Sequence, residues 1–205
     1  SLLISKLNHL FLSLPNPESN ILQSIKNICT NFIWNNVSKV KASVIVQSYE
    51  LGGLKLFNIN AFMNSLKITW MRRLILKEGG WTNIIRTYID MSKFMQCGQH
   101  YLQTISKNLN NQFWKDTFEA YTNMVELLPF HKNTTLHHPL FYNPKIIVGT
   151  RSIFSKSWYN AGICYIGDVF KFDKTMFTVE EFKSNYNIKC NVMTFLAITQ
   201  SIKTL

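Results

Sequence analysis

One segment constrains the fold more than any other, because its apolar residues occupy two sides of a helix. The segment reads NINAFMNSLKITWMRRLILK and extends from Asn58 to about Lys77. At 100° per residue, one broad apolar face is formed by Phe62, Met63, Leu66, Trp70 and Leu74, with Ile68, Met71 and Ile75 roughly opposite. A helix that is apolar on two sides must be covered by neighbours on both. The sequence therefore predicts a mainly α fold, with a helical bundle around this segment.

Signals at the ends of the predicted helices agree with this fold. Asn58 or Asn60 can cap the start of the central helix, and two glycines follow its end. Ahead of it, apolar residues recur at helical spacing before Pro15 and again after Ser19, which predicts a helical hairpin. One face of the second hairpin helix is formed by Ile21, Ile25, Ile28, Cys29 and Phe32.

A change of period separates the hairpin from the central helix. Val44, Ile45 and Val46 are β-branched, and the pair Gly52-Gly53 is a turn signal. We therefore expect a short β-ribbon with strands at roughly 43–48 and 54–57.

The second half of the chain shows weaker patterns. Helical spacing continues to Pro129, and β-branched residues around Gly149 then predict a small second hairpin. Two short helices end the chain, the first opened by a capping box at Thr178 and the second capped by Asn191. The expected organisation is a basic helical subdomain at 1–80, a helical connection at 81–129 and a small α+β segment at 130–205.

The charge balance indicates the class of partner. The chain has 22 Lys and Arg against 11 Asp and Glu, a net charge of +11, and residues 1–77 hold nine basic and two acidic side chains. Such an excess favours binding of polyanions such as nucleic acid, although the same charges also serve solubility.

A polar strip on the central helix is the most specific candidate for such binding. Ser65, Thr69 and Arg72 are spaced i, i+4, i+7, so two hydroxyl donors and a guanidinium group can face successive phosphates. Arg73 and Lys77 form a second basic pair. The alternative is that Arg72 only extends its charged end to solvent.

Motifs for other chemistry are weak. The four cysteines are at least 26 residues apart, which gives no zinc-ribbon spacing and suits reduced thiols in an intracellular protein. Adjacent His137 and His138, with His131, are better explained as loop residues than as a metal site. We find no nucleophile or phosphate-loop motif, so we expect no catalytic residue, metal or cofactor within this chain. No apolar run is long enough for a membrane span, so no membrane partner is expected. The chain starts without Met in an apparent helix, which suggests a piece of a longer protein.

Taken together, these residues resemble LINE-type (non-LTR) retrotransposon reverse transcriptases, in the stretch after the polymerase core. The resemblance rests on an aromatic–Ile–Trp element at Phe32–Trp34, a basic linker, the turn Gly52-Gly53-Leu54 and a helix that holds Leu66, Lys67, Trp70, Arg72, Arg73 and Leu74. Farther on, HPLFYNPKIIVGTRSIFSKSWYNAGICYIGDVF and FTVEEFKSNYNI also resemble this family, so the likeness covers nearly the whole chain.

The resemblance implies a thumb and a following helical connection, which grip template–primer duplex beside the palm and fingers of the parent polyprotein. The catalytic F/YADD motif of the palm is absent from these 205 residues. The implied role is thus nucleic-acid binding without catalysis. The implied ligand is either an RNA–DNA hybrid or a duplex, and the implied compartment is the nucleus or the cytoplasm. The expected contacts are Lys39, Lys41, Lys55, Ser65, Lys67, Thr69, Arg72, Arg73 and Lys77. The alternatives are a helical protein-interaction module and a decayed element copy without activity.

Overall fold

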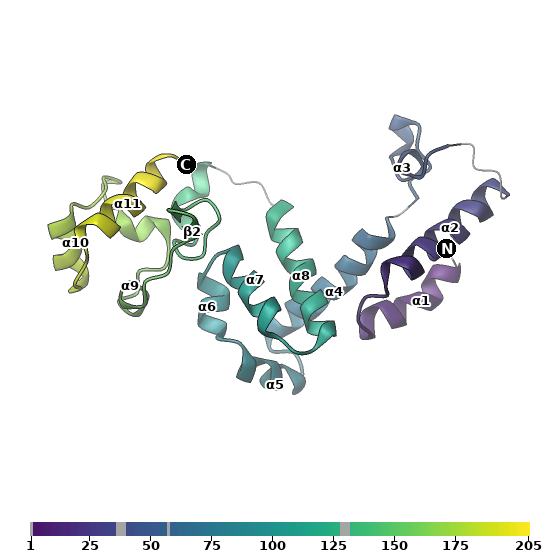
Figure 1. Ribbon diagram of the computed structural model, residues 1–205, viewed down its shortest axis with the longest axis horizontal. Coiled ribbons are helices and arrows are strands. Elements are labelled where there is room, and N and C mark those ends of the chain that lie inside the picture. Colours follow the sequence, from purple (N-terminus) through teal and green to yellow (C-terminus); the bar gives the residue numbers. More distant parts are fainter. Residues whose placement is uncertain (1, 36–39, 57, 128–131) are drawn as a thin grey trace. The chain divides into compact units, whose positions relative to one another are not determined.

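The computed structural model describes residues 2–35, 40–56, 58–127 and 132–205 (Figure 1). Within these ranges it contains 11 α-helices and one two-stranded antiparallel sheet, which confirms the mainly α prediction. The chain forms two compact units. Unit 1 comprises Ser1–Glu78 and Asn110–Tyr121, and unit 2 comprises Gly79–Leu109 and Thr122–Leu205. The expected connection at 81–129 therefore divides between both units.

Unit 1 is built from four helices, a 3-10 turn and the first part of a fifth helix. Its elements are α1 (Leu2–Ser13), α2 (Ser19–Trp34), α3 (Ala42–Ile45), η1 (Tyr49–Leu51), α4 (Ile59–Leu76) and the start of α8 (Gln112–Leu127). The Asn58 side chain caps α4 by accepting hydrogen bonds from the amides of Asn60 and Ala61, as its sequence predicts.

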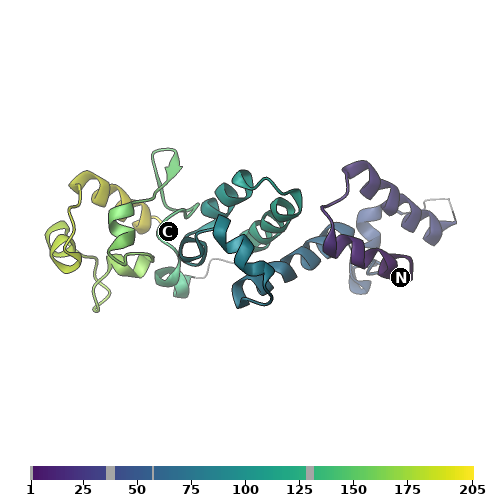
Figure 2. The same ribbon diagram turned by 90° about the horizontal axis from the view of Figure 1, so that it is seen from below.

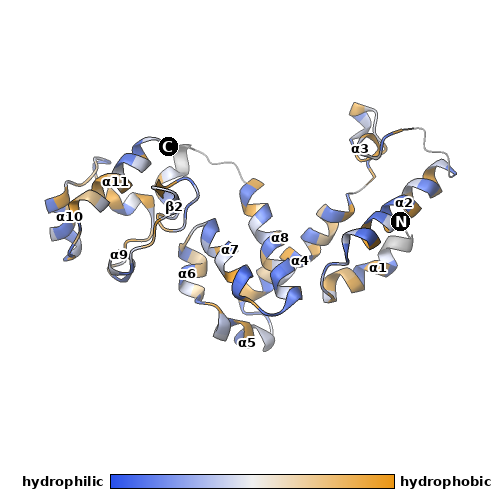
Figure 3. Ribbon diagram, in the orientation of Figure 1, coloured by the Kyte–Doolittle hydropathy of each residue, from blue (hydrophilic) through white to orange (hydrophobic). Residues whose placement is uncertain are grey.

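α4 is the central element of unit 1, and α1 packs against it (Figures 1 and 2). Hydrophilic and hydrophobic residues alternate along this helix (Figure 3). Its buried stripe is formed by Ile59, Met63, Lys67, Met71 and Leu74. The prediction that Met71 lies opposite Met63 was wrong. Two residues eight apart on a helix are separated by only about 80°, so both side chains enter the same core.

α2 differs from its neighbours because none of its described residues is buried. Ile21 and Ile28 are 49% and 56% exposed, and Phe32 is 89% exposed. Three of the five residues of the apolar face predicted for this helix are therefore turned to solvent within unit 1, and the other two, Ile25 and Cys29, are half-buried.

The predicted β-ribbon at 43–48 and 54–57 was wrong over the described residues, among which residue 57 is not included. Residues Ala42–Ile45 form a single helical turn, and the Ile45 carbonyl accepts hydrogen bonds from both the Leu54 and Leu56 amides. Ile45 is only 2% exposed, so its burial fixes this loop against the intrinsic preference of β-branched residues for strands. Gly52 has a φ of +76°, and a Cβ atom on Gly53 would lie 2.1 Å from the Gln47 carbonyl oxygen. The double glycine thus closes a tight loop rather than a hairpin.

Unit 2 combines short helices with one hairpin. Its elements are α5 (Trp81–Tyr88), α6 (Met91–Gln96), α7 (Gln99–Asn108), the end of α8, η2 (Lys132–His137), β1 (Ile147–Val148), β2 (Arg151–Ser152), α9 (Lys156–Asn160), η3 (Ile166–Val169), α10 (Val179–Tyr186) and α11 (Val192–Lys203). The hairpin predicted around Gly149 is confirmed, with Ile147 opposite Ser152. The core contains Trp158, Phe182 and Phe195, and the Phe182 ring lies 4.7 Å from that of Trp158.

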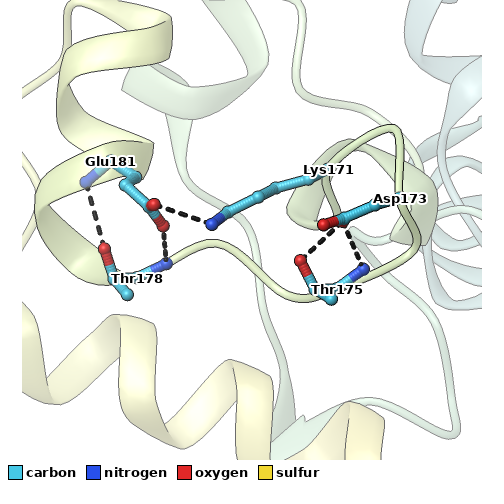
Figure 4. A network of polar contacts seen from close by, with 5 residues as sticks. All are labelled: Lys171, Asp173, Thr175, Thr178 and Glu181. Atoms are coloured by element: carbon cyan, nitrogen blue, oxygen red, sulfur yellow. Dashed lines mark hydrogen bonds and ion pairs between the residues drawn. The ribbon is translucent and has the colours of Figure 1, made fainter.

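A polar network fixes the start of α10 (Figure 4). Thr178 and Glu181 form the predicted capping box, and the Lys171 ammonium group donates to the Glu181 carboxylate at 2.7 Å. These hydrogen bonds lower the pKa of Glu181 to about 2, and the bond from Lys171 has the largest effect. Asp173 accepts hydrogen bonds from the amide and hydroxyl groups of Thr175 and closes the adjacent turn.

Two further findings concern the described part of the chain. The four cysteines are free thiols, with Cys97 and Cys164 buried. None of the described helices is both long and apolar enough to cross a membrane.

Candidate nucleic-acid interface

The polar strip predicted on α4 is present on its surface. Ser65, Thr69 and Arg72 are all exposed, because the buried stripe of the helix lies on another side. A long polyanion can therefore reach the Arg72 guanidinium group.

The two hydroxyl groups of this strip are already engaged. The Ser65 hydroxyl donates to the Phe62 carbonyl at 2.7 Å, and the Thr69 hydroxyl donates to the Leu66 carbonyl at 2.6 Å. A hydroxyl has one proton to donate, so donation to phosphate would break these intrahelical bonds. The donor role of both hydroxyls stays a prediction and requires that these bonds be exchanged for bonds to phosphate, whereas Arg72 is the exposed cation of the strip.

A cluster of positive charge lies at the C-terminal end of α4. Arg73 and Lys77 are exposed there, and the Arg73 guanidinium carbon lies 5.1 Å from the centre of the Trp70 ring. Lys77 also ends the helix, because it adopts a φ of +58° and its amide donates to the Arg73 and Leu74 carbonyls. Cations at this end interact favourably with the negative end of the helix dipole. They therefore stabilise α4 and also offer positive charge to a ligand.

Two lysines near the opposite end of α4 are exposed as well. Lys41 precedes α3, and Lys55 follows the Gly52-Gly53 turn with a φ of +51°. Lys39, the remaining predicted contact of this loop, lies outside the described residues.

The prediction that Lys67 contacts nucleic acid was wrong, because its side chain is 0% exposed. Its ammonium group donates to the Leu14 carbonyl just beyond the end of α1 and lies 4.0 Å from the centre of the Phe113 ring. Burial lowers the pKa of Lys67 from 10.5 to about 8, and the charge of Asp116 acts in the opposite direction.

Lys67 belongs to a group of contacts that holds the end of α1 against α4 and α8. The Trp70 indole donates to the Leu12 carbonyl at 2.8 Å, and the Asn16 amide donates to the Asp116 carboxylate at 2.6 Å. Trp70 also meets Phe113 edge to face, with ring centres 5.7 Å apart. Sequence reasoning missed this role of Lys67, although its position four residues from both Met63 and Met71 was an available signal.

Tryptophans near basic residues serve mainly for packing. Trp70 has the contacts just described, and Trp158 is 2% exposed in the core of unit 2. The Trp158 ring is therefore not available for stacking on a base, whereas Trp70 and Trp34 are both half-buried.

The exposed cations named above are not neutralised by ion pairs. Within the described part of the chain, Lys41, Lys55, Arg72, Arg73 and Lys77 form no ion pair, since the two pairs present involve Lys93 and Lys171 of unit 2. By sequence, unit 1 holds ten basic and five acidic residues, a charge of +5, and unit 2 holds twelve and six, a charge of +6. The excess of positive charge is therefore shared by both units.

The described residues contain no group of three or more His, Cys, Asp or Glu side chains that could hold a metal ion. His131, one of the three histidines considered above, lies outside those residues.

Comparisons with known proteins identify no relative of this chain. No protein-family model, curated protein or solved structure matches the chain.

Proposed function

We propose that this chain is a non-catalytic, nucleic-acid-binding part of a LINE-type reverse transcriptase. In this role unit 1 contacts the phosphate backbone of a template–primer duplex, either RNA–DNA hybrid or double-stranded DNA. The observation that carries the proposal is the set of five exposed cations without ion pairs on unit 1, formed by Lys41, Lys55, Arg72, Arg73 and Lys77. We refer to them as the unit 1 cations.

Several features support this role. Three of the unit 1 cations lie towards the C-terminal end of an 18-residue helix and two lie near its start, so the two groups are about 20 to 27 Å apart along the helix axis. Lysine and arginine side chains bind phosphates without reading base sequence. The resemblance described above places the same helix in the thumb of the family, beside palm and fingers domains, and implies action in the nucleus or cytoplasm.

Salt dependence of binding tests the proposal. The affinity of the chain for an RNA–DNA hybrid and for a DNA duplex would be measured from 50 to 200 mM salt by fluorescence anisotropy. We expect log K to fall linearly with log salt, with a slope of about −0.9 per phosphate contact. Arg72→Ala should reduce the magnitude of that slope by about one for every duplex sequence. Lys203→Ala, an exposed cation in unit 2, is the control. A slope near zero for the wild-type chain would reject the proposal.

A second candidate function is protein binding through the exposed face of α2. Phe32 is 89% exposed, and Ile21 and Ile28 lie on the same side of the helix. The palm and fingers domains of the parent polyprotein are the partners that the resemblance implies for such a face. Stoichiometric binding of those domains, together with no retention of nucleic acid, would favour this function.

A further inference from the structure

Unit 1 contains a groove that the backbone-binding role does not use. It has a volume of about 360 Å³ and lies between α2, α3 and the start of α4. This volume falls within the range of small-ligand sites.

The charge of the groove favours an anion. Lys26 of α2 is the one charged residue among the described residues that line it, and no acidic side chain does so. Lys26 forms no ion pair within the described part of the chain. An anionic group that enters the groove would therefore meet one uncompensated positive charge.

The rest of the lining combines an apolar surface with amide groups. Val46, which is 38% exposed, and the half-buried Leu56 contribute apolar area. Asn27, Asn60 and Gln23 contribute amides. The Gln23 side-chain amide donates to the side-chain oxygen Oδ1 of Asn27 at 2.9 Å, which orients the Asn27 side chain. Amide groups of this kind match the donor and acceptor edge of a nucleobase, and an apolar surface suits its ring.

The start of α4 is not the anion-binding element here. The Asn58 side chain already caps it by accepting from the Asn60 and Ala61 amides. An anion in the groove would thus depend on Lys26 rather than on free amides of the helix.

We propose that this groove binds one unpaired nucleotide of a nucleic acid held by unit 1. The base lies on the apolar surface, its edge meets the amides of Asn27 and Asn60, and Lys26 contacts its phosphate. A paired base cannot enter, because its edge and both faces are covered within a duplex. The proposal rests on the proposed function, since the backbone contacts would bring the strand to the groove.

Two duplexes with a one-nucleotide 3′ overhang test this inference. One carries adenine in the overhang and the other an abasic residue, so both have the same phosphates and differ only in the base. We expect the adenine probe to bind at least about fivefold more tightly, since contacts of one base are commonly worth 1–3 kcal/mol. Ser43→Trp, which places a ring in the groove from an exposed position, should reduce the affinity ratio of the two probes to about one.

Chemical labelling gives an independent readout on the wild-type chain. Cys29 lines the groove and is half-buried, whereas Cys190 of unit 2 is also half-buried and serves as an internal reference. The adenine probe should slow the reaction of Cys29 with N-ethylmaleimide severalfold relative to the abasic probe, without changing the rate at Cys190.

The outcomes separate the two proposals. If both probes bind equally and Cys29 reacts at the same rate with either, the groove does not bind a base, while backbone binding stands. If neither probe binds at 50 mM salt, both proposals fail.

Discussion

Lys67 carries a positive charge into the interior of unit 1, and its energetics depend on pH. Its ordinary pKa is 10.5, and burial lowers the folded-state pKa to about 8. Between these values the unfolded chain holds a proton that the folded chain has lost, so the free energy of unfolding rises with pH. The gain over this window is at most about 3 kcal/mol.

The expected result is that the urea midpoint of the wild-type chain rises between pH 8 and 10.5 relative to that of Lys67→Met. This substitution removes the titrating group and keeps an apolar stem in the buried stripe, so the variant lacks the contribution of Lys67 to the pH dependence. Tyrosine and cysteine ionisation affects both variants alike. Parallel pH profiles for the two proteins would contradict the assignment of this titration to Lys67.

Most element boundaries followed local sequence, with the loop that contains α3 as the exception, whereas the surroundings of each element did not. The span of α4, its Asn58 cap, the capping box of α10 and the hairpin at Gly149 all depend on residues close together in the chain. The burial of Lys67 and the exposure of Phe32 depend instead on which elements pack together, and helical spacing alone does not specify that. The exposed position of Arg72 was predictable because it follows from its place on the helix.

The loop before α4 is an element in which two adjacent glycines have different roles. Gly52 needs a left-handed backbone but has open space around it, whereas a Cβ on Gly53 would lie 2.1 Å from the Gln47 carbonyl oxygen. We expect Gly52→Ala to cost about 1 kcal/mol through backbone strain. Gly53→Ala should cost more than about 2 kcal/mol, because backbone atoms must move.

Urea unfolding of the two single variants measures this difference. Limited proteolysis should also cut residues 40–56 faster in Gly53→Ala than in Gly52→Ala, since the hydrogen bonds to the Ile45 carbonyl would be displaced. Equal stability of the two variants would show that the loop relaxes around the new methyl group.

On the scale of the whole molecule, net charge and charge placement are separate explanations for polyanion binding. Units 1 and 2 carry +5 and +6, so a purely nonspecific attraction would use both. Unit 2 offers a matched set of five exposed cations, formed by Arg151, Lys156, Lys174, Lys189 and Lys203. Replacing either set with glutamine lowers the net charge from +11 to +6.

If charge placement determines binding, the two variants with five substitutions each should therefore differ in the salt dependence of their binding. Glutamine at all five unit 1 cations removes up to five phosphate contacts, so the salt slope should fall in magnitude by about 4 to 5. The unit 2 variant should keep most of the wild-type slope, because the two proteins share the same net charge and differ only in where it lies. Salt titrations with one duplex measure both, and circular dichroism checks that each variant remains helical. Equal losses would assign binding to net charge and remove the basis for an interface on α4.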